Sequence, residues 1–266
     1  MGGAAGVWAS GERYEPYVGR WSRLVAHEFV TWLGVPEDAR WVDVGCGTGA
    51  LSAAISALAR PARVRGVDAS AAYIAFARRT NADDRVRFEE ADARALPFED
   101  GGDDAAVSGL ALNFVPEPER MVAEMARVVR RGGTVAAYVW DYADGMQLMR
   151  RFWDAAVALD PEARELDEGR RFPVCRPDAL EALWQRAGLA AVEAHTIEVP
   201  TIFRDFDDYW TPFLGAQGPA PAYAMALDDT RRTSLRERIR ESLPHAPDGT
   251  IALTARAWSV RGIHDR

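Results

Sequence analysis

The feature that most constrains this chain is a glycine-rich octet, Val42-Asp43-Val44-Gly45-Cys46-Gly47-Thr48-Gly49. Its apolar start is typical of a strand, and Leu51–Ile55 continues beyond it as a helix-forming run. Glycines allow positive φ angles and let a ligand come close to the backbone, while a helix start offers N–H groups that lack intrahelical partners. The octet therefore predicts a strand, a tight turn and a helix, with a ligand held at the turn.

Asp43 indicates the charge of that ligand. A dinucleotide-binding turn places a pyrophosphate at the helix start, and a carboxylate two residues before the first glycine would repel it. The glycine spacing alone leaves the question open, because Gly45, Gly47 and Ala50 also fit the loose G-x-G-x-x-G/A pattern. The acid favours a cationic ligand that carries an ammonium or a sulfonium, and a nicotinamide-binding domain is the alternative.

Two further acids stand at the ends of predicted strands. Asp68 follows the run Val64–Val67, and Asp92 follows Val86–Glu90. A single acid at a strand end commonly caps the next helix, and this interpretation stays open for either residue taken alone. Acids at three consecutive strand ends are much less ordinary and indicate one shared ligand site.

Together these motifs resemble the class I S-adenosylmethionine-dependent methyltransferases, in particular the type 11 branch that methylates small molecules. The resemblance covers about residues 38–140 and includes a fourth strand near Asp104–Leu110. It also includes Val128–Thr134 before the fifth strand, where the family usually has Pro and this chain has Arg131. It implies an α/β fold: a seven-stranded, mostly parallel Rossmann-like sheet with helices on both faces, an antiparallel final strand, and helical or loop insertions that cover the active site.

The resemblance implies that the chain binds S-adenosylmethionine and releases S-adenosylhomocysteine. Gly45, Cys46 and Gly47 would present their backbone to the methionine part, and Asp43 would orient the turn or meet the ammonium. Asp68 would accept hydrogen bonds from both ribose hydroxyls, and Ala69 and Ser70 would lie against the adenine. Asp92 would accept from the adenine amino group, assisted by the Ala93 N–H. The Gly109 and Leu110 carbonyls would face the ammonium.

An amphipathic helix is predicted over Trp21–Leu33, with Leu24 among its apolar positions. Related enzymes often fold an N-terminal Tyr or Arg over the cofactor carboxylate. The resemblance therefore makes Tyr17, Arg20 and Trp21 candidates for that contact. A solvated surface position is the alternative for Arg20.

The chain is expected to form one compact domain in four parts. These are residues 1–35 (a loose tail over 1–11 and the covering helix), 36–140 (the cofactor-binding core), 141–190 (an insertion and a helix after strand five) and 191–266 (strands six and seven with a long insertion at about 200–249). Both insertions leave the sheet near the edge where an α/β crevice opens, and loops there set ligand identity. A dimer interface or additional core is the alternative role for them.

Aromatic residues in and next to the insertions are the candidates for contact with the substrate. They are Trp140, Tyr142, Trp210, Phe213 and Tyr223. Aromatic side chains serve cores and interfaces as well as pockets, so a structural role is the alternative.

Methyl transfer gains mainly from holding nucleophile, carbon and sulfur in line, and a base is needed only when the nucleophile must first lose a proton. The four histidines are poor candidates for that base from their sequence positions. Asp141, just after strand five, is better placed, and capping the following helix is its alternative role. The lack of a convincing base favours an amine, thiol, activated carbon or phenol as the acceptor.

Composition excludes several other functions. The net charge of −8 disfavours nucleic-acid binding, and the absence of lysine excludes a Schiff-base or P-loop lysine. Cys46 and Cys175 lack metal-ligand spacing, so neither a metal site nor a structural disulfide is expected. We predict a cytoplasmic, monomeric or homodimeric enzyme that acts on a small molecule without nucleic-acid or membrane partners. A non-methylating S-adenosylmethionine-binding protein or a nicotinamide-dependent oxidoreductase is the alternative.

Overall fold

The computed structural model describes residues 15–215, 218–244 and 246–265. The expected loose tail over residues 1–11 lies outside them. Where the sequence predicts one domain, contacts group the chain into two compact units. The core unit comprises Ser22–Val139, Arg176–Ile197 and Trp258–Arg266, and the insertion unit comprises Met1–Trp21, Trp140–Cys175 and Glu198–Ala257.

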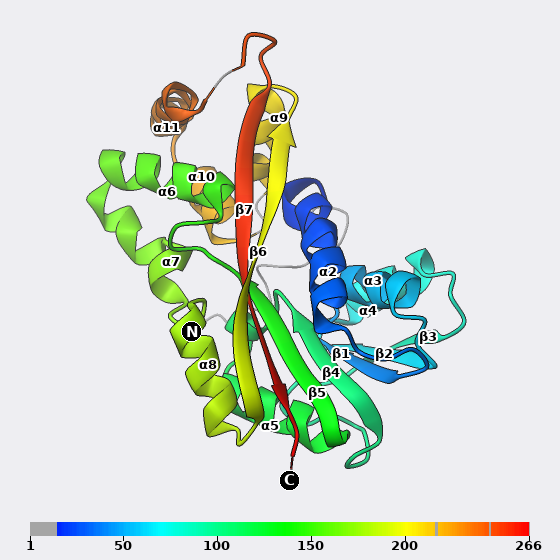
Figure 1. The fold of residues 1–266 in the computed structure, drawn as a ribbon. Helices are drawn as coiled ribbons and strands as arrows, with labels where there is room; N and C mark the ends of the chain where they lie inside the picture. Colours follow the sequence, from blue (N-terminus) through cyan, green and yellow to red (C-terminus); the bar gives the residue numbers. More distant parts are fainter. Residues whose placement is uncertain (1–14, 216–217, 245, 266) are drawn as a thin grey trace. The chain divides into compact units, whose positions relative to one another are not determined.

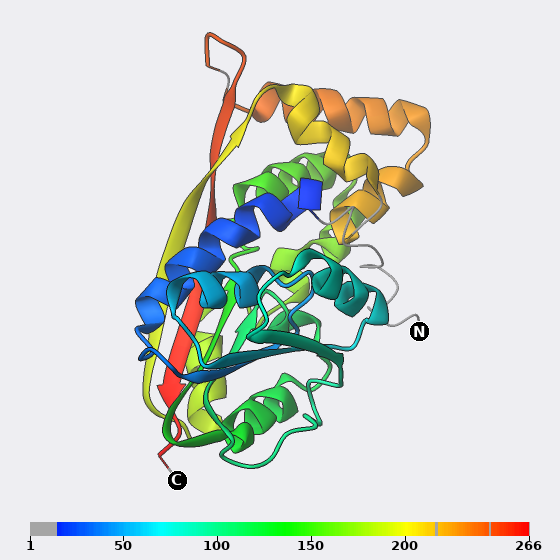
Figure 2. The same cartoon turned by 90° about the vertical axis from the view of Figure 1, so that its right-hand side faces the viewer.

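Seven strands form one sheet in the order β3-β2-β1-β4-β5-β7-β6 (Figure 1). They are β1 (Arg40–Val44), β2 (Arg63–Asp68), β3 (Val86–Glu90), β4 (Asp103–Gly109), β5 (Val129–Trp140), β6 (Ala190–Phe203) and β7 (Ile251–Ile263). The first five pair in parallel, and the long β6 and β7 lie side by side (Figures 1 and 2). The mostly parallel sheet with antiparallel final strands confirms the predicted fold class.

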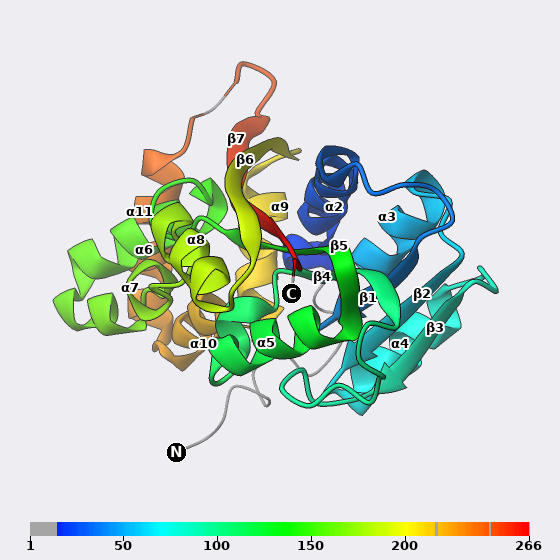
Figure 3. The same ribbon diagram turned by 60° about the horizontal axis from the view of Figure 1, so that its bottom comes forward.

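Helices flank the sheet within the core unit. They are α2 (Arg20–Leu33, which starts in the insertion unit), α3 (Ala50–Leu58), α4 (Ala71–Thr80), α5 (Pro118–Val128) and α8 (Pro177–Arg186), with a short 3-10 turn, η3, over Leu112–Phe114. Figure 3 shows α2 and α3 on one side of the strands and α5 and α8 on the other. Because β2, β1 and β4 are parallel neighbours, the residues after these strands lie at one edge of the sheet.

The buried stripe of the N-terminal helix is displaced from the one that the sequence predicts. Val25, Phe29 and Leu33 are buried, but Leu24 is 42% exposed. Successive residues of an α-helix point about 100° apart, and the buried stripe follows positions 25, 29 and 33, so Leu24 faces away from it. The prediction that Leu24 belongs to the core stripe is wrong.

The fifth strand starts inside the run Val128–Thr134, which the resemblance places before it. It begins at Val129 and passes an irregularity in its pairing with β4 between Asp103 and Ala105. Gly133 permits this path, because a Cβ there would stand 2.4 Å from a Val129 methyl group and 2.6 Å from the Asp104 carbonyl oxygen. Gly132 and Gly133 therefore lie inside the strand.

The insertion unit is mainly helical. It contains η2 (Glu15–Gly19), α6 (Gln147–Leu159), η4 (Pro161–Leu166), α7 (Glu168–Arg171), α9 (Phe206–Trp210), η5 (Thr211–Gly215), α10 (Pro219–Ala226) and α11 (Asp229–Ser242). Its centre is aromatic: Phe213 is fully buried and packs against Phe152, Tyr17 and Tyr209 at ring-centroid distances of 4.6, 5.5 and 5.6 Å. No helix among the described residues is long and apolar enough to span a bilayer.

Candidate functional site

The glycine turn between β1 and α3 is built as the sequence predicts. Gly45, Gly47 and Gly49 have φ angles of 74°, 52° and 89°, a region that side chains disfavour. The Gly45 and Cys46 N–H groups donate to the Val67 carbonyl oxygen at 2.8 and 2.9 Å, which fastens the turn to β2. A Cβ on Gly45 would stand 2.4 Å from the Ala111 Cβ, whereas a Cβ on Gly47 would meet nothing within 4 Å. Gly47 therefore leaves open space above the backbone of the turn.

Asp68, at the end of β2, holds this turn in place. One carboxylate oxygen accepts from the Gly47 N–H at 3.0 Å and the other from the Ser70 N–H at 2.8 Å. Burial raises the pKa of Asp68, and these two hydrogen bonds oppose that rise. Since each carboxylate oxygen can accept a second hydrogen bond, the carboxylate keeps capacity for two neighbouring hydroxyl groups.

Asp43 lies fully buried at the end of β1. One of its oxygens accepts from the Ser52 hydroxyl at 2.7 Å, and the other has no hydrogen-bond partner among the described residues. Burial raises the pKa of Asp43 to about 7, and the charge of Asp68 adds to this effect. A cation nearby would favour the ionised form of Asp43, while a phosphate would disfavour it further. Burial also raises the pKa of the Cys46 thiol, which disfavours its thiolate form.

The acid after β3 differs from the other two. Asp92 is exposed and paired with the Arg94 guanidinium, at 2.8 Å and 3.0 Å, and this pairing lowers the pKa of Asp92 to about 2. It stays ionised at neutral pH and is an acceptor at the surface beside the half-buried Ala93. Its contact with an adenine amino group remains a prediction.

The end of β4 has a strained backbone. Gly109 is needed there, because a Cβ would stand 2.5 Å from the Tyr138 hydroxyl oxygen. Leu110 takes a left-handed φ of 59°, and its N–H donates to the Tyr138 carbonyl oxygen at 2.8 Å. Beyond it, both polar atoms of the Asn113 amide are buried without a hydrogen-bond partner among the described residues. Asn113 was not predicted from the sequence, where its only signal is that it is the sole polar residue in Leu110–Pro116.

The predicted N-terminal contacts belong to the insertion unit. Arg20 donates from one terminal nitrogen to both Asp208 oxygens at 3.2 Å, and its guanidinium lies 4.3 Å from the Trp21 ring centre and 4.9 Å from that of Phe203. Tyr17 is buried, and burial raises the pKa of its phenol. Their role toward a cofactor carboxylate remains a prediction.

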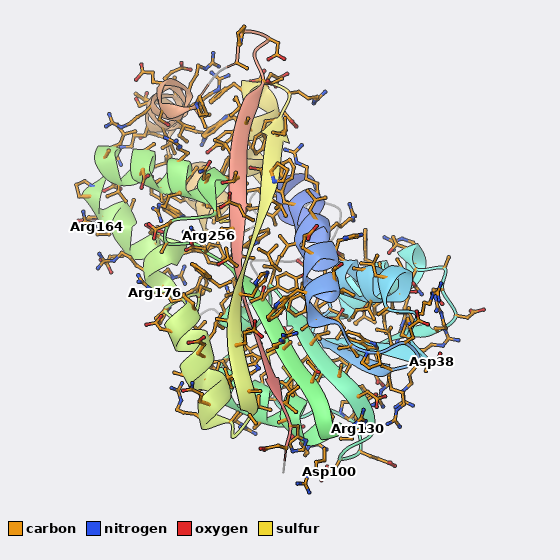
Figure 4. The ribbon with its side chains drawn as sticks, in the orientation of Figure 1. Asp38, Asp100, Arg130, Arg164, Arg176 and Arg256 are labelled. Carbon is orange, nitrogen blue, oxygen red and sulfur yellow. The ribbon has the colours of Figure 1, made fainter. Side chains whose placement is uncertain are left out.

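Asp141 is anchored by β7. Its Oδ2 accepts from Arg256 at 2.7 Å (Nε) and 2.6 Å (Nη2), and its Oδ1 accepts from the Asp144 N–H at 3.2 Å (Figure 4 labels Arg256). Helix α6 begins only at Gln147, so Asp141 closes the preceding turn instead of capping that helix. The arrangement favours an anchoring role, and proton abstraction by Asp141 remains a prediction.

The described histidines lie exposed or contact groups of the core unit, and the remaining aromatic candidates lie in the insertion unit. His27 is exposed, His195 stacks on Trp32 with ring centres 5.0 Å apart, and Nδ1 of His264 contacts the Val129 carbonyl oxygen at 2.7 Å; His245 lies outside the described residues. Of the predicted substrate residues, Trp140, Tyr142, Trp210 and Phe213 are buried and Tyr223 is half-buried, all in the insertion unit. No group of three or more potential metal ligands occurs among the described residues.

A second missed residue is Glu168, at the start of α7. Its carboxylate is buried and accepts from the Trp153 indole N–H. Burial raises the pKa of Glu168 to about 7. Nothing in the sequence distinguishes Glu168 from its neighbours Glu162 and Glu165, which are exposed.

Several known proteins are similar to this chain in sequence. A sequence model described as a methyltransferase domain matches residues 42–137. The malonyl-[acyl-carrier protein] O-methyltransferase of Pectobacterium atrosepticum is 31% identical over 175 residues, which cover 60% of this chain and 67% of that protein. The 2-methyl-6-phytyl-1,4-hydroquinone methyltransferase of Synechocystis sp. is 28% identical over 198 residues, which cover 72% of this chain and 61% of that protein.

A solved structure shares the fold. It is a candidate methyltransferase from an antibiotic biosynthesis pathway of Anabaena variabilis, with a TM-score of 0.61 and 20% identity, covering 88% of this chain and 95% of that chain. The sheet order, the glycine turn and these matches lead to one conclusion. The chain belongs to the class I methyltransferase family that its motifs resemble.

Proposed function

We propose that this protein transfers the methyl group of S-adenosylmethionine to a small-molecule acceptor. The observation that carries the proposal is the turn after β1, where the open backbone at Gly47 is bonded to the half-buried Asp68 carboxylate and the buried Asp43 stands at the end of the preceding strand. A sulfonium and an ammonium suit these carboxylates, and the two ribose hydroxyls match the spare acceptor capacity of Asp68. A pyrophosphate would be repelled at the same place.

The residues present fit this donor. Gly45, Cys46 and Gly47 would hold the methionine part, with Asp43 and the Gly109 and Leu110 carbonyls near its ammonium; Asp68, Ala69, Ser70, Asp92 and Ala93 would hold the adenosine part. The donor supplies an electrophilic methyl group on a positively charged sulfur. The chain's own residues bind, orient and keep water away, and such positioning can supply roughly 7–11 kcal/mol of the barrier.

The acceptor is a small molecule whose nucleophile is an amine, a thiol, an activated carbon or a phenol. The Arg256 pairing of Asp141 and the structural positions of the described histidines support a reaction that needs little help from a base. The name of one relative, which acts on a hydroquinone, is consistent with this class. Contact of the acceptor with Trp140, Asp141, Tyr142, Trp210, Phe213 or Tyr223 remains a prediction.

The proposal is tested by isotope-traced transfer from methyl-labelled S-adenosylmethionine to a panel of phenols, hydroquinones, thiols, amines and unactivated alcohols. We expect label in at least one of the first four classes, with S-adenosylhomocysteine formed in equal amount. Asp68→Ala should abolish the transfer, because the variant loses the hydroxyl acceptor and the tie to Gly47. Binding of S-adenosylhomocysteine without any transfer would instead indicate a non-methylating protein, and turnover of unactivated alcohols alone would contradict the assigned acceptor class.

A further inference from the structure

The turn after β4 carries an unexplained polar group, the Asn113 amide. Its Oδ1 and Nδ2 are both buried, and neither has a hydrogen-bond partner among the described residues. An unsatisfied buried polar atom costs about 1–3 kcal/mol, so the fold gains nothing from this amide as it stands. Side chains that carry such a cost need a reason, and a ligand is one.

The backbone around Asn113 is strained at both ends. Leu110 and Glu117 take left-handed φ angles of 59° and 57° although neither is glycine. Each left-handed residue costs roughly 1–2 kcal/mol, and residues of this kind cluster at functional sites. The short 3-10 turn that carries Asn113 is thus held between two strained residues, directly after the carboxyl end of β4.

The sheet order indicates which part of the bound cofactor or acceptor would lie beside this turn. The proposed adenosine contacts follow β2 and β3, and the glycine turn follows β1. The turn with Asn113 follows β4, on the other side of β1, and its Ala111 abuts Gly45. The adenosine side of the site is therefore taken, and the β4 side is left for the methionine end and the incoming acceptor.

The residues on either side of Asn113 in the sequence indicate which acceptors it would recognise. Leu110, Ala111, Leu112, Phe114, Val115 and Pro116 are all apolar. An amide is uncharged and offers one acceptor oxygen and two N–H donors. This segment offers no charged side chain to pair with a charged acceptor, and an unpaired buried charge is costly. An uncharged molecule with one hydrogen-bonding group would match the Asn113 amide.

We propose that Asn113 is a specificity-determining residue that hydrogen-bonds the methyl acceptor, and that this acceptor is an uncharged, largely apolar molecule with a hydroxyl or carbonyl group close to the methylated atom. This inference rests on the proposed function. It adds the acceptor class and a residue that binds it.

The test compares Asn113→Leu, which keeps the size of the side chain and removes its polar atoms, with Ser259→Ala. Ser259 is the control because its hydroxyl is also buried without a partner among the described residues, but on β7. Three quantities are measured for each protein: the thermal midpoint without ligand, the affinity for S-adenosylhomocysteine, and kcat/KM with the best acceptor of a panel of uncharged phenols and hydroquinones and their ammonium- or carboxylate-bearing analogues.

For the wild-type protein we expect turnover of the uncharged members of the panel above that of their charged analogues. For Asn113→Leu we expect an unchanged or higher thermal midpoint, because an unsatisfied amide is removed. Its affinity for S-adenosylhomocysteine should stay within about twofold, and kcat/KM should fall roughly tenfold or more, the effect of one lost hydrogen bond. Ser259→Ala should leave kcat/KM unchanged.

Four results would overturn the inference. A lower thermal midpoint for Asn113→Leu would show that the amide stabilises the fold, and weaker binding of S-adenosylhomocysteine would assign Asn113 to the cofactor. The other two are an unchanged kcat/KM for Asn113→Leu and a preference of the wild-type protein for charged acceptors. These outcomes differ from failure of the proposed function, in which the wild-type protein itself transfers no label. In that case the inference falls with the function on which it rests.

Discussion

Replacing Gly47 with Ala is expected to weaken binding of S-adenosylhomocysteine roughly tenfold or more, equivalent to at least about 1.4 kcal/mol. The added methyl group would enter the open space above the glycine turn, where nothing of the protein lies within 4 Å. In our account that space belongs to the methionine part of the cofactor. The effect is measured by isothermal titration calorimetry.

Gly34→Ala is the matched control for this substitution. Gly34 has a similar φ of 60° and equally open surroundings, but it follows helix α2 and is not among the proposed cofactor contacts. Both variants should lose about 1–2 kcal/mol of folding free energy from the left-handed backbone. Only Gly47→Ala should lose affinity, and an equal loss in both variants would show that backbone strain, not occupied space, explains the effect.

The second large effect concerns pH and Glu168. In the folded protein burial raises the pKa of Glu168 to about 7, from an ordinary value of 4.5. Below pH 4.5 the carboxyl is protonated in both the folded and the unfolded chain, so it does not affect stability. Between pH 4.5 and 7 the folded chain binds the extra proton, so the free energy of unfolding falls as the pH rises. Over this window the loss is roughly 3 kcal/mol, at 1.36 kcal/mol per pKa unit.

Glu168→Gln removes this loss because its side chain does not titrate. We expect the variant to gain stability relative to the wild type by about 3 kcal/mol between pH 4.5 and pH 8, as measured by urea unfolding at each pH. Part of the slope should persist in the variant, because the pKa of Asp43 is also raised to about 7. Glu165→Gln, at an exposed position of η4, should show no such gain. Parallel curves for Glu168→Gln and the wild type would contradict a raised pKa at Glu168.

The cofactor turn was predictable because its information is local. Positive φ angles at Gly45, Gly47 and Gly49 follow from residue type, and the acids at the ends of β1 and β2 follow from where the apolar runs stop. The parallel order of these strands then places Asp43 and Asp68 at the same edge. The fold class could be predicted, and is confirmed, because the strands and turns that define it are likewise encoded by local runs of residues.

The partners of the other candidates could not be predicted from sequence. Asp141 meets Arg256 across 115 positions of the chain, and Arg20 meets Asp208 across 188. Such pairs depend on how distant segments pack, and no local pattern encodes them. The same holds for Glu168 and Asn113, because residue type does not show whether a carboxyl or an amide is buried or lacks a partner.

We expect the carboxylates around the glycine turn to select a positively charged adenosyl donor over a phosphate-bearing cofactor. Calorimetric titration of the wild-type protein with S-adenosylhomocysteine and, separately, with NAD tests it most directly. We expect saturable 1:1 binding of S-adenosylhomocysteine and no measurable binding of NAD. Tight binding of NAD together with no binding of S-adenosylhomocysteine would contradict the account.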